Sequence, residues 1–238
     1  MKAIITGAAR GIGAEVARLL ARKGYTLGLL DVDEGSLQEF ATSLRAEGAQ
    51  VEALSVDVRN ATDVSSAMSQ LAQSMNGIDV VINSAGVNYF GGISQCTEEE
   101  FTTALAINLG GYFNVTKAAL PFLATSSCAH IINMSSVWAL EGSPTMTAYA
   151  TSKHAVEGFT KSLRKDVGPK GIKVTSLILD IVDTDFRRLM VANVNFNEQQ
   201  RKCMLAASDV ADAVAYVLAA SPRSLPSTIT LDAWLFRR

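Results

Sequence analysis

A glycine-rich segment near the start of the chain reads Thr6-Gly7-Ala8-Ala9-Arg10-Gly11-Ile12-Gly13. A short apolar run, 3–5, precedes it, and an amphipathic run, 14–20, follows it. This order predicts a strand, a tight glycine turn and a helix. Glycines let the backbone approach a ligand closely, and the helix N-terminus offers free N–H groups to a pyrophosphate. Because the spacing is G-x-x-x-G-x-G and not the G-x-G-x-x-G of the standard dinucleotide motif, a purely structural turn is the alternative.

An acidic residue closes the second predicted strand. Asp31 lies eighteen positions after Gly13 (31 − 13) and follows the apolar run 27–30. A carboxylate there can accept both hydroxyls of an adenosine ribose and repels a 2′-phosphate. Arg10 points the other way, since a basic residue in the glycine loop could pair with that phosphate. Because the carboxylate would stand directly at the ribose and the arginine is a flexible surface residue, we expect NAD in preference to NADP.

A tyrosine and a lysine lie four residues apart in a stretch with helical spacing, and a serine precedes them. These are Tyr149 and Lys153, with Ser136 thirteen positions before the tyrosine (149 − 136). On a helix the tyrosine and the lysine share one face, one turn apart. A phenol with a pKa of about 10 is a poor base near neutral pH, and a neighbouring cation lowers that pKa. Together with the glycine loop, the spacing indicates an acid–base pair beside a dinucleotide.

Strand-like and helical runs alternate along the chain. Short buried strands are predicted at 51–56, 79–83, 130–134 and 172–178. Helical spacing occurs at 36–47, 62–75, 98–123, 148–167 and 208–219, with Ser36 and Ser208 as expected N-caps. The alternation predicts a Rossmann-type, doubly wound α/β fold, with a parallel sheet of about seven strands and helices on both faces, in one domain, 1–238. Ligands bind beyond the carboxyl ends of such strands, just where the sequence has Gly7, Asp31, Asp57, Asn83, Ser136 and Asp180.

Taken in order, these motifs resemble those of the short-chain dehydrogenase/reductase family, in its single-domain branch. The similarity runs from Lys2 to about Thr184 and then fades. Each motif is short and separately weak, so it is their common order that gives the resemblance its force. The matching motifs are the T-G-x-x-x-G-I-G loop, Asp57-Val58, Asn83-Ser84-Ala85-Gly86, Asn108, Ser136, and Tyr149 with Lys153.

The resemblance implies a role for each matching residue. Tyr149 would be the acid–base, and Lys153 would bind the nicotinamide ribose and lower the tyrosine pKa. Ser136 would hydrogen-bond the substrate oxygen, and Asn108 would hold a water on the proton path to solvent. The implied reaction couples one proton transfer to one hydride transfer between NAD(H) and a secondary alcohol or ketone. The implied cofactor-binding residues are Gly7, Arg10, Gly11, Ile12, Gly13, Asp31, Asp57, Val58, Asn83, Ala85, Gly86, Tyr149, Lys153, Asp180, Val182 and Thr184.

Two positions depart from the family's pattern. Ser84 replaces the second asparagine of N-N-A-G, a mild change in a segment that mainly supports the sheet. Leu179-Asp180 stands where the family usually has Pro-Gly, at the point where the backbone meets the nicotinamide. Because Asp tolerates left-handed backbone better than most residues, we expect the turn to survive. We hypothesise that Asp180 contacts a polar substrate or favours the oxidised, cationic nicotinamide; a solvent-facing carboxylate without a role is the alternative.

The sequence leaves the substrate open, and a medium-sized alcohol or ketone with some polar groups fits. The segment 185–207 is expected to form a helical substrate lid. By resemblance, helices at 98–123 and 147–167 would pair with a second subunit, which predicts a homodimer or homotetramer. Each candidate substrate residue could equally serve in lid packing or a subunit contact; these are Asn88, Tyr89, Trp138, Glu141, Met146, Phe186, Met190 and Phe196.

Composition argues against several other classes of protein. The chain has 238 residues and a net charge of −2, which gives no electrostatic reason to expect nucleic acid or an anionic membrane. Its three cysteines are far apart, so neither a metal site nor a disulfide framework is expected. No apolar run approaches the roughly 20 residues that span a bilayer. Because Lys2 already leads into the first strand, we expect no signal peptide and a cytoplasmic protein.

Other functions fit the sequence less well than hydride transfer. An NAD-binding sensor or structural protein that has lost turnover is favoured only by Leu179-Asp180 and by the atypical C-terminal stretch 229–234. The presence of the serine, tyrosine, lysine and asparagine argues against it. Isomerase or dehydratase activity on a nucleotide sugar is disfavoured because few residues follow the sheet. A hydrolase triad has no support, since no G-x-S-x-G element occurs.

Overall fold

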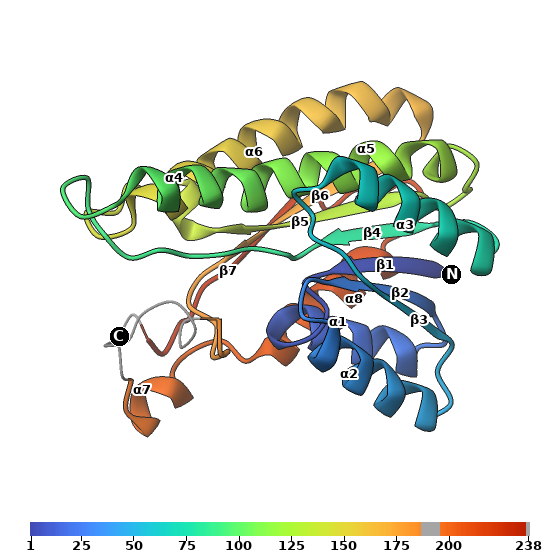
Figure 1. Ribbon diagram of the computed structural model, residues 1–238, viewed down its shortest axis with the longest axis horizontal. Coiled ribbons are helices and arrows are strands. Elements are labelled where there is room, and N and C mark those ends of the chain that lie inside the picture. The colour runs from blue at the N-terminus through green and yellow to red at the C-terminus, as the bar shows by residue number, and fades with distance from the viewer. Residues whose placement is uncertain (187–195, 237–238) are drawn as a thin grey trace.

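The protein is described here by a computed structural model that covers residues 1–186 and 196–236. These residues form a parallel sheet of seven strands in the order β3-β2-β1-β4-β5-β6-β7, which confirms the predicted fold (Figure 1). The strands are β1 (Lys2–Thr6), β2 (Thr26–Asp31), β3 (Val51–Ser55), β4 (Val80–Asn83), β5 (His130–Ser136), β6 (Lys173–Leu179) and β7 (Thr228–Leu231).

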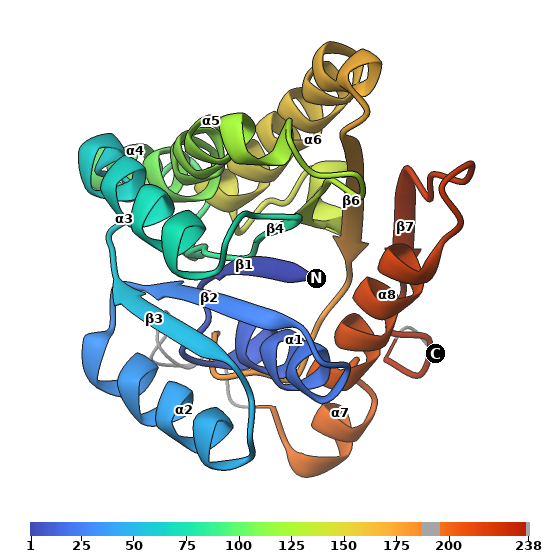
Figure 2. The ribbon, with the colours of Figure 1, turned by 90° about the vertical axis from the view of Figure 1, so that its right-hand side faces the viewer.

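Helices cover both faces of the sheet, as Figure 2 shows. One face carries α1 (Gly11–Arg22), α2 (Glu34–Ala46) and α8 (Ala207–Ala219). The other carries α3 (Ala61–Ser74), α4 (Glu98–Leu105), α5 (Tyr112–Leu123) and α6 (Thr147–Val167). A short helix, α7 (Glu198–Lys202), precedes α8, and 3-10 turns follow β5 and α6 at Val137–Ala139 and Gly168–Lys170. Among the described helices, none is long and apolar enough to cross a membrane.

Each face of the sheet has its own apolar core, because successive residues of a strand point to opposite faces. In β1, Ile5 packs on the side of α1 and α8, whereas Ile4 packs on the side of α3 and α5. Both side chains are fully buried. Burying a side chain of this size contributes about 1.5–3 kcal/mol relative to leaving it exposed. Burial on both faces explains why the strands read as continuous apolar runs in the sequence.

The two predicted N-caps are wrong, and in both cases an aspartate explains the difference. Helix α2 begins at Glu34, because the Asp33 carboxylate accepts hydrogen bonds from the main-chain N–H (3.2 Å) and hydroxyl (2.9 Å) of Ser36. Helix α8 begins at Ala207, and the Asp209 carboxylate accepts the N–H of Ala206 at 2.8 Å. A carboxylate near a helix N-terminus satisfies free N–H groups and also interacts favourably with the helix dipole.

The predicted helix at 98–123 is divided by a π-helical turn, Ala106–Gly111, between α4 and α5. Such turns replace the i→i+4 hydrogen bonds of the α-helix with i→i+5 bonds and occur frequently at functional sites. Asn108 lies in this turn and is fully buried. A Cβ on Gly111 would come within 2.6 Å of a Val58 side-chain carbon. The turn therefore packs tightly against the loop that follows β3.

Candidate active site

A cavity of about 620 Å³ opens at the carboxyl edge of the sheet. The loops after β1 to β6 all contribute to its walls, as expected for a doubly wound sheet. The predicted site residues that line it are Gly7, Arg10, Gly11, Ile12, Asp31, Asp57, Val58, Ala85, Gly86, Asn88, Ser136, Trp138, Met146, Tyr149, Lys153, Asp180, Val182, Thr184, Phe186 and Phe196. Those not found in its lining are Gly13, Asn83, Tyr89, Asn108 and Glu141, and Met190 lies outside the described residues.

The glycine loop between β1 and α1 is shaped by backbone packing. Gly7 has a φ of +64°, and a Cβ there would lie 2.9 Å from the main chain of Ala85. A Cβ on Gly13 would lie 2.1 Å from the carbonyl oxygen of Gly7. Gly13 is therefore required for the start of α1 to pack on the turn, which explains why it is absent from the cavity lining. The loop can adopt this form only with glycine at both positions.

The N-terminus of α1 has room for an anion. Its N-cap residue, Arg10, makes no side-chain cap, and no acidic residue lies in the first turn. Helices α2, α3 and α4 each have a side-chain cap instead. The first-turn residues Gly11 and Ile12 line the cavity. Free N–H groups and the positive end of the helix dipole suit a pyrophosphate, so the residues present fit a dinucleotide.

Two carboxylates hold the loop after β2 in place. Asp31 accepts the main-chain N–H of Ala9 at 2.9 Å and that of Asp33 at 3.0 Å, which fixes its carboxylate at the cavity wall. Arg10 forms an ion pair with Asp33. The Ser36 main-chain N–H, together with Arg10, holds the pKa of Asp33 below its usual range. Arg10 is therefore already matched by a carboxylate of the protein.

Asp57 and Val58 follow β3 and differ in their surroundings. Three hydrogen bonds of 2.6–3.0 Å join the Arg59 guanidinium to the Asp57 carboxylate and hold its pKa below the usual value. Val58 is buried, and Arg59 itself lines the cavity. The Arg59 side chain therefore fixes the orientation of the Asp57 carboxylate.

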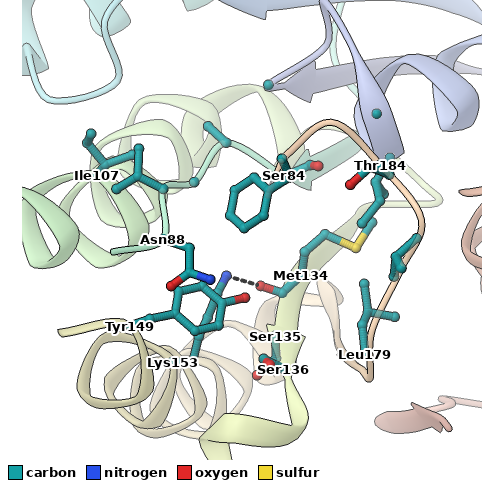
Figure 3. Close-up of a pocket in the computed structure, with 18 of the residues that line it drawn as sticks. Ser84, Asn88, Ile107, Met134, Ser135, Ser136, Tyr149, Lys153, Leu179 and Thr184 are labelled. Atoms are coloured by element: carbon teal, nitrogen blue, oxygen red, sulfur yellow. Dashed lines mark hydrogen bonds between the residues drawn. The ribbon is translucent and has the colours of Figure 1, made fainter. Parts of the chain in front are cut away.

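Tyr149 and Lys153 enter the cavity from α6 (Figure 3). The Lys153 ammonium donates a 2.9 Å hydrogen bond to the carbonyl of Met134 near the end of β5. It also lies 5.4 Å from the ring centre of Tyr112. Burial lowers the pKa of Lys153 to about 8, and the charge of Glu157 acts in the opposite direction. The lysine is thus a buried, positioned cation beside the tyrosine.

Two adjacent serines at the end of β5 line the same cavity. The Ser136 hydroxyl oxygen accepts the main-chain N–H of Trp138 at 3.2 Å. Because that bond uses an oxygen lone pair, the hydroxyl hydrogen of Ser136 is left for another acceptor. The Ser135 hydroxyl is buried and has no hydrogen-bond partner among the described residues. A buried hydroxyl of this kind is costly unless a ligand or water satisfies it.

Two of the three predicted asparagines, Asn83 and Asn108, are buried in hydrogen-bond networks outside the cavity lining. Asn108 accepts the N–H of Val87 at 2.7 Å and donates to the Val87 carbonyl and to the Ser152 hydroxyl. That hydroxyl donates to the carbonyl of Tyr149 at 2.7 Å. Asn83 donates to side chains of its neighbours on α5 and β5. Asn108 therefore ties a cavity wall to helix α6, and its amide hydrogens are both engaged.

Asp180 is held by the C-terminal part of the chain. Its carboxylate accepts the N–H of Ala233 at 3.2 Å, and its own N–H donates to the carbonyl of Leu231 at 2.9 Å. Outside glycine, positive φ occurs among the described residues only at Asn76. Asp180 therefore does not use the left-handed backbone that aspartate tolerates, and its N–H continues the pairing with the strand beside it. The alternative of a carboxylate facing only solvent is contradicted.

Part of the expected lid, 185–207, is described. Helix α7 lies within it, and an Arg201–Asp183 hydrogen bond of 2.9 Å fastens that helix to the segment after β6. A β-bridge between Val182 and Leu205 adds a second attachment. The middle of the segment, 187–195, lies outside the described residues.

Phenylalanine side chains contribute to the cavity wall. The ring of Phe186 lies 6.3 Å from that of Tyr149, and the rings of Phe196 and Phe236 lie 5.9 Å apart. Phe90 and Phe236 line the cavity but were not expected from the sequence. Phe90 directly follows the candidate substrate residues Asn88 and Tyr89, so its place in the sequence could have identified it. Phe236 gave no such signal, because only a long-range contact brings it to the site.

The chain is similar to a known protein family and to known oxidoreductases. A family model described as short chain dehydrogenase matches residues 1–195. An uncharacterized oxidoreductase of Staphylococcus epidermidis is 33% identical over 216 residues, covering 91% of this chain and 90% of that protein. A 3-oxoacyl-(acyl-carrier-protein) reductase of Chlamydia trachomatis is 34% identical over 193 residues, covering 81% of this chain and 78% of that protein.

Solved structures with the same fold agree closely along the chain. An alcohol dehydrogenase from the archaeon Thermococcus sibiricus, complexed with 5-hydroxy-NADP, has a TM-score of 0.90 and 27% identity and covers 100% of this chain and 97% of that one. A short-chain dehydrogenase/reductase from Burkholderia phymatum, in complex with NAD, has a TM-score of 0.85 and 28% identity, with 96% and 88% covered. The two neighbours were therefore solved with different dinucleotides.

Proposed function

The chain belongs to the short-chain dehydrogenase family of oxidoreductases, and we propose that it transfers a hydride between NAD(H) and a secondary alcohol or ketone, with Tyr149 as the acid–base. The observation that supports this most strongly is the convergence of Tyr149, Lys153 and Ser136 on one cavity. The same cavity extends to the N-terminus of α1 and to Asp31, so the acid–base pair and the dinucleotide would share it.

The proposed preference for NAD rests on charge at the end of β2. A 2′-phosphate on the adenosine ribose would meet the fixed carboxylate of Asp31. Like charges brought together at a binding site cost several kcal/mol. Arg10, which could offset this, is paired with Asp33. The known neighbours do not decide the question, because one was solved with NAD and another with an NADP derivative.

The proposed mechanism assigns one task to each side chain. When bound, the nicotinamide would supply or accept the hydride. In the reduction direction, the Tyr149 hydroxyl gives its proton to the substrate oxygen, and in oxidation the phenolate takes it back. The Ser136 hydroxyl donates a hydrogen bond to the same oxygen, where negative charge develops. The neighbouring ammonium of Lys153 stabilises the phenolate form of the tyrosine.

The proton route from Lys153 to solvent would use main-chain atoms of the π-helical turn. Both amide hydrogens of Asn108 already donate to Val87 and Ser152. We propose that a water on this route is held by a main-chain carbonyl oxygen of the π turn. In this proposal, the Asn108 side chain holds the π turn in a fixed position relative to α6, through its hydrogen bond to Ser152.

We also propose that the chain works as one domain in a cytoplasmic homodimer or homotetramer. Helices α5 and α6 would form the subunit contact. Phe113 of α5 is 48% exposed and packs edge-to-face with Phe159 of α6 at 6.5 Å, which offers an apolar surface for a partner. Light scattering on the purified protein would give the mass of the assembly, and Phe113→Glu should lower that mass.

The test of the function is a screen of alcohols and ketones that follows nicotinamide absorbance with NAD(H) and NADP(H). We expect turnover with the NAD pair and its loss in Tyr149→Phe, with NADH binding kept. Turnover that survives in Tyr149→Phe would remove the proposed acid–base. NADH binding without turnover on any substrate would favour the sensor or structural alternative instead.

A further inference from the structure

We propose that the C-terminal segment, 232–236, is a wall of the substrate site that Asp180 holds in place, and that Phe236 there selects substrates with an aromatic or bulky apolar group. This inference rests on the proposed function, because it names a substrate class for the same cavity. It also gives the unusual residue at position 180 a task that does not involve the reaction itself.

The anchor is a pair of contacts on either side of Asp232. Strand β7 pairs with β6 in parallel, with Leu231 opposite Leu179. The Asp180 N–H extends this pairing to the Leu231 carbonyl at 2.9 Å, and its carboxylate then accepts the Ala233 N–H at 3.2 Å. Ala233 is 1% exposed. A glycine at position 180 would keep the first contact and lose the second.

Beyond the anchor, the chain reverses toward the cavity. The N–H of Trp234 donates to the Asp232 carbonyl, and the N–H of Phe236 donates to the Ala233 carbonyl, both at 2.9 Å. This turn leaves the side chains of Trp234 and Leu235 66% and 57% exposed. Phe236, at 36%, is more sheltered and lines the cavity. The turn therefore directs one aromatic ring of the C-terminal segment to the site.

The ring of Phe236 contacts the ring of Phe196, which lies within the expected lid, 185–207. Its centre lies 5.9 Å from that of Phe196, with the two planes at 76°. Edge-to-face contacts of this geometry are favourable beyond the area that they bury. Both residues line the cavity, as does Phe186, whose ring centre lies 6.3 Å from that of Tyr149. An aromatic or alicyclic group next to the reacting carbon would be packed by these rings.

Phe236→Ala, with Leu235→Ala as the matched control, tests the selection. The substrates are acetophenone and 2-butanone, an aryl and a small alkyl ketone of the same reaction class. We expect Phe236→Ala to lower kcat/KM for acetophenone by roughly tenfold, mostly through KM, because pocket contacts of this size discriminate by 10-fold or more. Its kcat/KM for 2-butanone should change by less than about twofold, as should both values in Leu235→Ala.

Equal losses on the two ketones, or no loss on acetophenone, would overturn the selection by Phe236. Titration with NADH, followed by nicotinamide fluorescence, separates this effect from cofactor binding. We expect the NADH dissociation constant of Phe236→Ala to match that of the wild type. A weakened NADH affinity would show that the ring supports the nicotinamide end, which contradicts the proposal.

The anchor is tested without turnover. The chain has two tryptophans, so a Trp138→Phe background leaves Trp234 as the single emitter. In that background, Asp180→Ala should lower the fluorescence anisotropy of Trp234 and increase its quenching by acrylamide. Asp180→Asn keeps an acceptor oxygen for the Ala233 N–H and should stay close to the parent. Circular dichroism checks that each variant is folded.

Unchanged anisotropy in folded Asp180→Ala would refute the anchor. The two arms also separate this proposal from the function on which it rests. If no ketone is reduced but the anisotropy falls as expected, hydride transfer to these ketones fails and the anchored segment stands. If turnover is normal and the ketone preference does not respond to Phe236→Ala, the function stands and the selecting wall is rejected.

Discussion

The ammonium of Lys153 lies 5.6 Å from the ring centre of Tyr149, one helical turn away on α6. The lysine is buried, and its hydrogen bond to Met134 fixes its position. A cation held this close favours the ionised form of a phenol. The same burial disfavours the cation itself, so the arrangement that suits catalysis should weaken the fold.

Lys153→Met should therefore stabilise the protein while abolishing turnover. Burial lowers the pKa of Lys153 from 10.5 to about 8, so the unfolded state binds more protons between these values and stability rises with pH there. Below pH 8 the buried cation destabilises the fold by up to about 3 kcal/mol. The Met134 carbonyl keeps its bond from Tyr112 at 3.0 Å when the lysine is removed.

Urea denaturation at pH 7 and pH 10 measures this effect. We expect the gain in Lys153→Met to be largest at pH 7 and to shrink at pH 10. Lys161→Met, at an exposed position of the same helix, is the control and should change little. A Lys153→Met protein that is less stable than the wild type at pH 7 would contradict the argument.

The two adjacent serines should differ in their effect on the rate. Ser136→Ala removes the donor proposed for the substrate oxygen and should lower kcat by about 10²–10³, as for a lost oxyanion-stabilising donor. Ser135→Ala removes a buried hydroxyl without a partner among the described residues, so we expect a loss of less than about tenfold and a small gain in stability. Steady-state kinetics on both variants decides between them, and a larger loss in Ser135→Ala would reverse the assignment.

Asp31→Asn should shift the cofactor preference toward NADP. The amide oxygen can still accept the Ala9 N–H, whereas the bond from the Asp33 N–H is lost together with the negative charge. We expect the ratio of kcat/KM for NADP to that for NAD to rise by about tenfold or more. Glu34→Gln, an exposed carboxylate on α2, is the matched control. A wild-type protein with a higher kcat/KM for NADP than for NAD would contradict the proposed preference for NAD.

Stability should fall as the pH drops from 6.5 toward 4, partly because of His130. Burial lowers the pKa of this histidine to about 4, with Lys173 contributing. Between the two values the unfolded state takes up a proton that the folded state does not, which costs up to about 3 kcal/mol. His130→Gln should flatten this part of the stability profile in urea titrations. His154→Gln, at an exposed position on α6, should leave the profile unchanged.

The contact made by the His130 ring fixes which ring nitrogen carries the proton in the neutral form. Its Nε2 lies 2.8 Å from the Thr175 hydroxyl oxygen, and that hydroxyl donates to the carbonyl of Pro226 at 2.8 Å. The histidine must therefore be the donor to Thr175. A profile equally steep in His130→Gln and in the wild type would show that other groups dominate the acid sensitivity.

The fold was predictable because strands buried on both faces are continuous apolar runs. Such runs can be recognised from the local sequence, without knowing which strands lie next to them. Strand β6, expected at 172–178, spans Lys173–Leu179. Helix starts were less predictable, because two residues close in sequence can each cap a helix. Asp33 caps α2 in place of the expected Ser36. Periodicity also gave no sign of the π turn at Ala106–Gly111, since a single extra residue per turn hardly disturbs a helical pattern.

Within the site, local motifs predicted the residues that lie directly after strands or on one helix face. Tyr149 and Lys153 line the cavity for this reason, and their roles stay predictions. Glu141 was proposed from a similar position but is exposed and outside the cavity lining. Phe236 could not be foreseen, because it depends on a contact between Asp180 and Ala233, 53 positions apart.

The first turn of α1 has no side-chain cap, so its N–H groups are available to a ligand. If a dinucleotide supplies the missing partners, binding at a concentration of 100 times Kd adds about 2.7 kcal/mol to the free energy of unfolding. Without that ligand, the protein would unfold more often, and proteases would cleave it more often. How long each molecule survives in a cell would then follow the supply of nicotinamide dinucleotide, before any substrate is encountered.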